Sequence, residues 1–282
     1  MIKNQFKTAI LLGLLTALLL WAGSLFGKSG FIFALIFVVL MNFATYWFSH
    51  KIVLWMYKAK EAKEKEHLKL FKIVREVSRL SKIPMPKVYI IPSQSPNAFA
   101  TGRNPKNAVV AATEGILNLL DEDELKGVIA HEFAHIKNRD ILISTVAGTI
   151  AGVIGYAAAM TRWAAIFGYG GRDRDSGNNI IGLIVLGIVT PLIATLIQLA
   201  ISRSREYLAD ETGAKFVRNG DALATALEKI EKNIDVNPLR FGNNATAHLF
   251  ISNPFRNTSW LKFFMTHPST KNRVDRLRGM KF

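Results

Sequence analysis

The stretch His131-Glu132-Phe133-Ala134-His135 has the spacing H-E-x-x-H, with a glutamate beside the first of two histidines. In an α-helix, side chains at i and i+4 lie on one face about one turn apart. Both imidazoles can then bind one zinc ion while Glu132 stands beside it as a base. The alternative is a chance match, which the composition makes roughly a one-in-a-hundred event in a chain of this size. The motif therefore predicts a zinc peptidase.

The residues before the motif predict the helix that it needs. Asp121 followed by Glu124 fits a capping box, in which each side chain satisfies an unpaired amide of the first turn. Apolar residues then recur at helical spacing, at Leu125, Val128, Ile129, Phe133 and Ile136. Because a catalytic zinc takes three protein ligands and keeps one position open for water, a third ligand must come from elsewhere in the chain.

Half of the 282 residues are hydrophobic, and four apolar stretches without a charged residue account for this: residues 9–26, 31–47, 141–160 and 180–201. Each has about the length that spans a bilayer as a helix. The first could instead be a cleaved signal peptide, but its apolar run is long and lacks a small-x-small cleavage site, so we expect an anchor. These stretches predict an integral membrane protein, mainly α-helical, with about four spans.

The basic residues indicate how the spans are oriented. They concentrate at one end of the spans, at Lys3, Lys7, Lys51, Lys58, Lys60, Lys63, Lys65, Lys137, Arg139, Arg203 and Arg205. By the positive-inside rule, we expect both termini and both large polar regions to be cytoplasmic. The net charge of +15 then suits attraction to anionic lipid headgroups, and no nucleic-acid motif is present. The chain has no cysteine, which excludes disulfides and thiolate zinc ligands.

The spans divide the chain into four parts. We expect a transmembrane hairpin over residues 1–50, a first cytoplasmic part over 51–140, a second hairpin over 141–201, and a second cytoplasmic part over 202–282. The second hairpin leaves the cytoplasm and returns, so it brings the residues after 201 beside those before 141.

Glu206 and Asp210 are the residues that return in this way. Glu206 can supply the third zinc ligand, and Asp210, one turn further, can accept the spare N–H of a ligating histidine. The alternative makes both of them solvated partners of neighbouring basic residues, at Arg203, Arg205 and Lys215. The topology favours the metal site.

His267 and Arg273 are weaker candidates. His267 precedes a short predicted helix that carries Arg273, and such a pair could stabilise the oxyanion of a tetrahedral intermediate. A histidine that packs or caps locally is the alternative.

A substrate strand is predicted upstream. Residues 88–92 and 108–112 are strand-like, and Asn97, Ala98, Phe99 and Ala100 lie between them. An edge strand beside the metal can bind a peptide through main-chain hydrogen bonds, whatever its side chains. An ordinary hairpin with its turn at residues 101–104 is equally compatible with the pattern.

Taken in order, four motifs resemble the HtpX family of heat-shock membrane proteases, which is related to the CAAX prenyl endopeptidases. They are residues 97–102, 131–135 and 206–210, and Thr266-His267-Pro268. The resemblance implies a cytoplasmic α+β gluzincin-type zinc domain with a small β-sheet. It implies one zinc held by His131, His135 and Glu206, with Glu132 as base and Asp210 in support. Residues 97–100 would bind substrate, and His267 and Arg273 would assist at the transition state.

The resemblance also implies a biological setting. The protein would reside in the bacterial inner membrane, degrade misfolded or damaged membrane proteins under stress, and work beside other quality-control proteases. Two alternatives compete with this prediction. A CAAX-type endopeptidase typically has more spans, which enclose a chamber. A non-enzymatic membrane scaffold with a vestigial site has no reason to keep the base and all three ligands.

Overall fold

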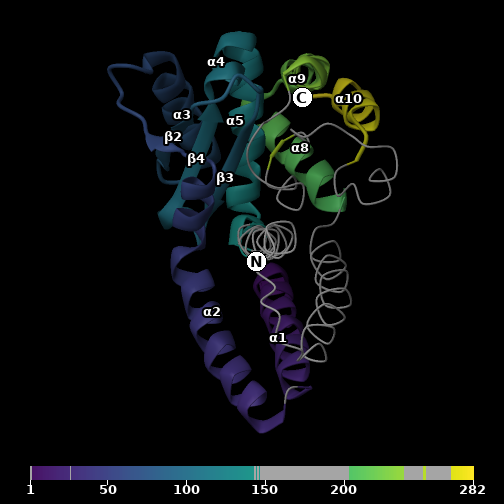
Figure 1. The fold of residues 1–282 in the computed structure, drawn as a ribbon. Helices are drawn as coiled ribbons and strands as arrows, with labels where there is room; N and C mark the ends of the chain where they lie inside the picture. Colours follow the sequence, from purple (N-terminus) through teal and green to yellow (C-terminus); the bar gives the residue numbers. More distant parts are fainter. Residues whose placement is uncertain are drawn as a thin grey trace.

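Two long N-terminal helices project from a body in which helices pack on a small sheet (Figure 1). This computed structural model describes residues 2–25, 27–142, 144, 146, 203–237, 250, 251 and 268–282. The predicted spans over 141–160 and 180–201 therefore lie almost entirely outside the described residues. The proposed division into four parts remains a prediction for the same reason.

The projecting helices are α1 (Ile2–Ser24) and α2 (Gly27–Met56), which pack against each other as a hairpin. Gly27 at the turn has φ +74°, a conformation that glycine adopts without strain. A Cβ added at Gly23 would lie 2.3 Å from the Cβ of Ala34, so the small residue lets the two helices approach closely.

The apolar surface of this hairpin faces outward. Within the described part of the chain, one helical stretch is long and apolar enough to cross a membrane, Gly27–Ala44, with a mean hydropathy of 1.8. Only 11% of that stretch is buried, and Phe33 is 72% exposed. A shorter apolar stretch, Leu12–Ser24, lies in α1. A large exposed apolar surface of this kind suits lipid. The four predicted spans are thus supported only in part.

The sheet is mixed and has four strands in the order β1-β2-β4-β3. The strands are β1 (Lys60–Glu61), β2 (Lys87–Ile91), β3 (Ala98–Gly102) and β4 (Ala108–Thr113). β2 runs parallel to β4, while β3 pairs antiparallel with β4 across the short 3-10 helix η1 (Pro105–Asn107). The small predicted sheet is confirmed, and β3 is both one arm of a hairpin and an edge strand. Because β1 has only two residues, it is too short to be predicted from a sequence pattern.

The helix α5 (Glu122–Lys137) lies at the centre of the body and packs against α3, α8, α9 and β3. Its predicted capping box is present between Asp121 and Glu124, and its apolar positions are fully buried. The remaining helices are α3 (Leu68–Ser81), α4 (Glu114–Leu119), α8 (Arg203–Val217), α9 (Asp221–Val236) and α10 (Thr270–Arg278).

Glycines bring two of these helices into close contact with α5. A Cβ added at Gly213 on α8 would lie 2.8 Å from the backbone nitrogen of His131. A Cβ at Gly127 would lie 2.9 Å from the backbone nitrogen of Leu223 on α9. Real Cβ contacts are longer than this, so the missing side chain at Gly213 lets α8 lie directly against the H-E-x-x-H turn.

Candidate metal centre

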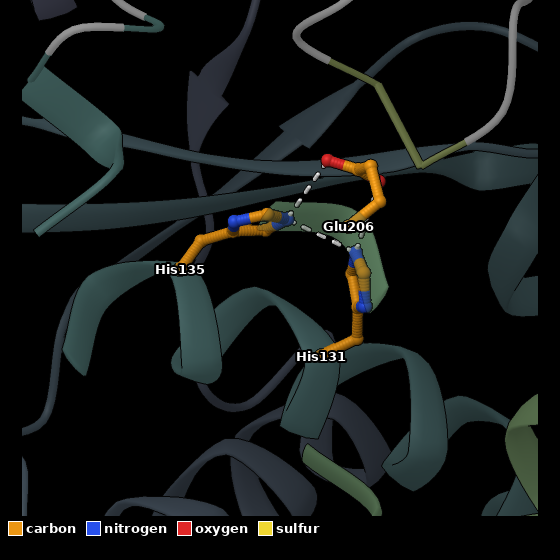
Figure 2. Close-up of side chains that lie close together, drawn as sticks. All are labelled: His131, His135 and Glu206. Carbon is orange, nitrogen blue, oxygen red and sulfur yellow. Dashed lines mark hydrogen bonds and ion pairs between the residues drawn. The ribbon is translucent and has the colours of Figure 1, made fainter. Parts of the chain in front are cut away.

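Three side chains from two helices converge at one point between α5 and α8 (Figure 2). His131 and His135 come from α5, and Glu206 comes from the first turn of α8. One ligand atom from each lies within 4.8 Å of the others. The two imidazole Nε2 atoms are 3.1 Å apart, and Glu206 Oε1 lies 3.5 Å from the Nε2 of His135. The two residues that the sequence placed 71 positions apart, His135 and Glu206, are thus neighbours.

The surroundings of the rings show that this group fits a metal cation. Asp210 Oδ1 lies 2.9 Å from the Nδ1 of His131, and Asp140 Oδ2 lies 3.2 Å from the Nδ1 of His135. Each carboxylate accepts the Nδ1–H, so a neutral ring turns the lone pair of its Nε2 toward the other ring. Two such lone pairs and a carboxylate repel one another unless a cation lies between them. Two imidazoles and one carboxylate form a ligand set that zinc takes in catalytic sites.

The electrostatics of the two rings differ. Burial lowers the pKa of His131 to about 4, and the hydrogen bond to Asp210 only partly offsets this. Burial also acts to lower the pKa of His135, but the hydrogen bond to Asp140 and the charge of Glu206 outweigh it and raise that pKa to about 9. A metal cation that binds here therefore displaces the proton that His135 otherwise holds at neutral pH.

Glu132 follows His131 on α5, and its side chain reaches the edge strand β3. It is only 3% exposed, and its Oε2 accepts a hydrogen bond of 2.7 Å from the backbone N–H of Ala100. Burial raises the pKa of Glu132 to about 7, against the opposing effects of His135 and the Ala100 hydrogen bond. A carboxyl group with a pKa near neutrality can both take and return a proton.

Arg273 reaches the site from α10 and is 2% exposed. Its Nε and Nη2 donate to Asp210 at 2.9 and 2.7 Å, a bidentate pair. Burial acts to raise the pKa of Asp210, but the charge of Arg273 and the bonds from His131 and Arg273 lower it to about 2. Arg273 thus holds the carboxylate that orients His131. Its predicted part at the transition state stays a prediction, and His267 lies outside the described residues.

The predicted substrate strand borders the site. Asn97 precedes β3, where its backbone N–H donates to Thr113 Oγ1 at 2.9 Å. Ala98, Phe99 and Ala100 belong to β3, and alternation along an antiparallel pair turns the main chain of Ala98 and Ala100 away from β4. The strand is therefore in position to offer main-chain groups beside Glu132, while its binding of substrate remains a prediction.

Asp140 is the functional candidate that sequence reasoning missed. Arg139 adopts a left-handed conformation with φ 61°, and the backbone N–H of Asp140 donates to the carbonyl of His135 at 3.0 Å. This turn places the Asp140 side chain beside the imidazole of His135. The available signal was a carboxylate five residues after His135, because a predicted ligating histidine needs an acceptor for its second nitrogen.

Comparisons with known proteins agree with this geometry. The profile of Peptidase family M48 matches residues 64–281. A "Protease HtpX homolog" from Syntrophobacter fumaroxidans is 52% identical over 281 residues, which cover 98% of this chain and 99% of that protein. A "Protease HtpX homolog" from Thermococcus sibiricus is 52% identical over 275 residues, which cover 96% of this chain and 94% of that protein.

A solved structure is also similar in fold. The crystal structure of S. mikatae Ste24p aligns with a TM-score of 0.52 at 20% sequence identity and covers 98% of this chain. The chain in turn spans 66% of the length of that protein. At this identity, the likeness concerns the fold alone.

Proposed function

Since the chain belongs to peptidase family M48, we propose that it is an HtpX-type zinc endopeptidase that cleaves misfolded or damaged membrane proteins at the cytoplasmic membrane surface. The observation that carries the proposal is the group of His131, His135 and Glu206, with Glu132 next to His131 and hydrogen-bonded to an edge strand. The termini and the site would be cytoplasmic, and the chain would cross the membrane several times. Because the similar proteins include one from Thermococcus as well as bacterial ones, we propose a cytoplasmic membrane rather than a bacterial inner membrane alone.

The ligand group would hold one zinc ion. Bound there, zinc would polarise a peptide carbonyl and lower the pKa of a water molecule toward neutrality. Asp140 and Asp210 would keep both imidazoles in the tautomer that leaves Nε2 available to the metal. Arg273 would in turn keep Asp210 ionised.

Glu132 would move the proton. It would take a proton from the attacking water and later return it to the leaving amine, the two tasks of a general base and acid. The hydrogen bond from Ala100 holds its carboxylate at the edge of β3, where a bound peptide would run. His267 and Arg273 remain the proposed groups for stabilising the oxyanion.

The substrate class follows from two features of the site. An edge strand recognises a peptide through its main chain, which suits unfolded segments of any sequence. The end of α2 packs behind this strand, since Val53, Leu54 and Tyr57 share an apolar cluster with Phe99. If α2 crosses the bilayer, the site lies within reach of segments close to the membrane surface.

The test uses the purified full-length chain in detergent with zinc and an unfolded protein as substrate. We expect zinc in both the wild type and Glu132→Gln, with cleavage reduced about 10²–10⁴-fold in the variant. Glu122→Gln is the matched control, because it makes the same change at an exposed position of the same helix. If the wild type and Glu132→Gln are equally inert with zinc bound, the protein is a scaffold. A clear preference for farnesylated over unmodified peptides would support the CAAX-type alternative instead.

A further inference from the structure

Phe250 and Ile251 lie against the outward edge of β3. The backbone N–H of Ile251 donates to the carbonyl oxygen of Ala98 at 3.2 Å. The carbonyl of Ile251 accepts a hydrogen bond of 2.9 Å from Nη1 of Arg273. Both main-chain groups of Ile251 are therefore bound, one by the edge strand and the other by a side chain of the metal site.

The two side chains alternate as they do in a strand. Phe250 packs edge-on against Tyr57 and Phe99, with ring centroids 4.8 and 5.3 Å apart. Ile251 belongs instead to the core cluster that contains Ala98 and Ala100. Successive strand residues point to opposite faces of a sheet, and Phe99 and Ala98 differ in the same way. The pair is therefore seated like the start of an additional strand beside β3.

The position of Ile251 on β3 lies next to the side chains of the candidate metal centre. Arg273 bridges the Ile251 carbonyl to Asp210, which holds His131. Ala100, two residues along β3 from Ala98, donates to Glu132. A peptide that adds to the edge of β3 needs the Ala98 carbonyl as an acceptor, and Ile251 already occupies it.

We propose that Phe250 and Ile251 act as an internal competitor, which occupies the place of a substrate strand on β3 and has to leave before a substrate binds. The apolar pocket beside Tyr57 and Phe99 then receives a large apolar side chain of the substrate. The inference rests on the proposed function, because it assumes that β3 binds the substrate. An occupied site lowers the competent fraction of the enzyme, which raises KM and leaves kcat unchanged.

The test measures kcat and KM of the full-length, zinc-loaded chain on a short fluorogenic peptide. Phe250→Ala removes the aromatic anchor, and Ile251→Pro removes the N–H donor while Phe250 stays in place. We expect each to lower KM at least about fivefold with kcat unchanged, as release of a competitor requires. The control is Ile234→Ala, which truncates a buried apolar side chain on α9 and should leave KM unchanged. Unaltered or raised KM in both test variants, or an equal fall in the control, overturns the inference.

A second measurement does not depend on the variants folding. A synthetic peptide of residues 247–253 should inhibit the wild type competitively, and the same peptide with Phe250→Asp should inhibit at least about tenfold less, because a charge cannot enter the apolar pocket unpaired. If the two peptides inhibit equally or not at all, the segment is a fixed wall and the inference fails. An inactive, zinc-loaded wild type would instead remove the proposed function, so the two failures are distinguishable.

Discussion

The metal centre and the outer surface of the same helices are built from the same kinds of ion pair, in different settings. On the surface, Lys72 lies 2.6 Å from Glu122, and Arg278 lies 3.0 Å from Glu228. In the centre, Arg273 lies 2.7 Å from Asp210. The distances are nearly equal, but both side chains of the central pair are at most 5% exposed. Water screens the surface pairs, whereas a buried charge that loses its partner has nothing to replace it.

The buried pairs are also ordered in a way that the surface pairs are not. Each imidazole of the centre meets a carboxylate, and each carboxylate meets a guanidinium: Arg273 and Asp210 support His131, while Arg205 and Asp140 support His135. The series Arg205, Asp140 and His135 is the looser of the two, since Arg205 Nη1 lies 3.9 Å from Asp140. The buried charges therefore orient the two imidazoles of the candidate metal centre, while these exposed pairs orient no such group.

The largest effect is expected from Arg273→Met, which leaves Asp210 buried without its cation. Removal of one partner of a buried pair typically costs about 3–5 kcal/mol of unfolding free energy. Arg278→Met, five residues further along α10 and exposed, is the control and should unfold like the wild type. Unfolding of the purified chain in denaturant measures both. Equal stability of the two variants would remove the distinction between buried and exposed pairs.

A smaller effect is expected from Asp140→Asn, which keeps the shape of the side chain but removes the charge beside His135. Loss of such a partner typically weakens metal affinity about 10–100-fold. Competition with a chelator gives the zinc affinity, and Asp275→Asn, an exposed change on α10, is the control. If Asp140→Asn binds zinc as tightly as the wild type, the contact between Asp140 and His135 does not support metal binding.

Asp121 is an exposed carboxylate with hydrogen bonds, so its replacement tests how much such a group stabilises the fold without burial. The backbone N–H of Glu124 lowers its pKa below the usual value. The stabilisation that the charged carboxylate gives to the folded state is therefore fully present above the unfolded pKa near 3.9. It is lost as the pH falls through the folded pKa. Asp121→Ala should cost about 1 kcal/mol at neutral pH, as N-caps do, and less in acid, where the carboxyl loses its charge but can still accept a hydrogen bond. Asp123→Ala is the control in the same turn, and unfolding at both pH values is the measurement. An equal loss in acid would show that the charge of the carboxylate does not contribute to the cap.

The smallest effect is expected from Lys72→Met. Both side chains of its pair with Glu122 are exposed, so solvent and salt screen it. The unfolding temperature should match that of the wild type at both low and high salt. A clear, salt-sensitive loss of stability would blur the contrast between the surface and the centre.

Much of the catalytic helix could be predicted from local patterns. The capping box at Asp121, the helical spacing of the apolar residues and the i, i+4 histidines all depend on neighbours within a few residues. These signals are local because hydrogen bonds and side-chain contacts of a helix form between residues three or four apart. The strands β2 and β4 were also visible in this way, as the strand-like stretches 88–92 and 108–112, whereas the two-residue strand β1 was too short to show a period.

Asp140 and the pair Phe250 and Ile251 could not be predicted so directly. Asp140 serves His135 only because Arg139 takes a left-handed turn that most sequences avoid. Phe250 and Ile251 make their contacts with α2, β3 and α10, and a two-residue segment has no period to detect. Their positions depend on packing between distant parts of the chain.

The sequence was enough to predict the chemistry: two imidazoles on one helix face with a glutamate beside them, a carboxylate that follows an apolar hairpin, and a candidate strand for substrate. The tertiary structure was needed to show which carboxylate supports which imidazole, that Arg273 holds Asp210, and that Ile251 lies on the edge of β3. The physical reason is that ligand type and helical spacing are local properties. The pairing of buried charges and the filling of a strand edge require residues far apart in sequence to leave water together.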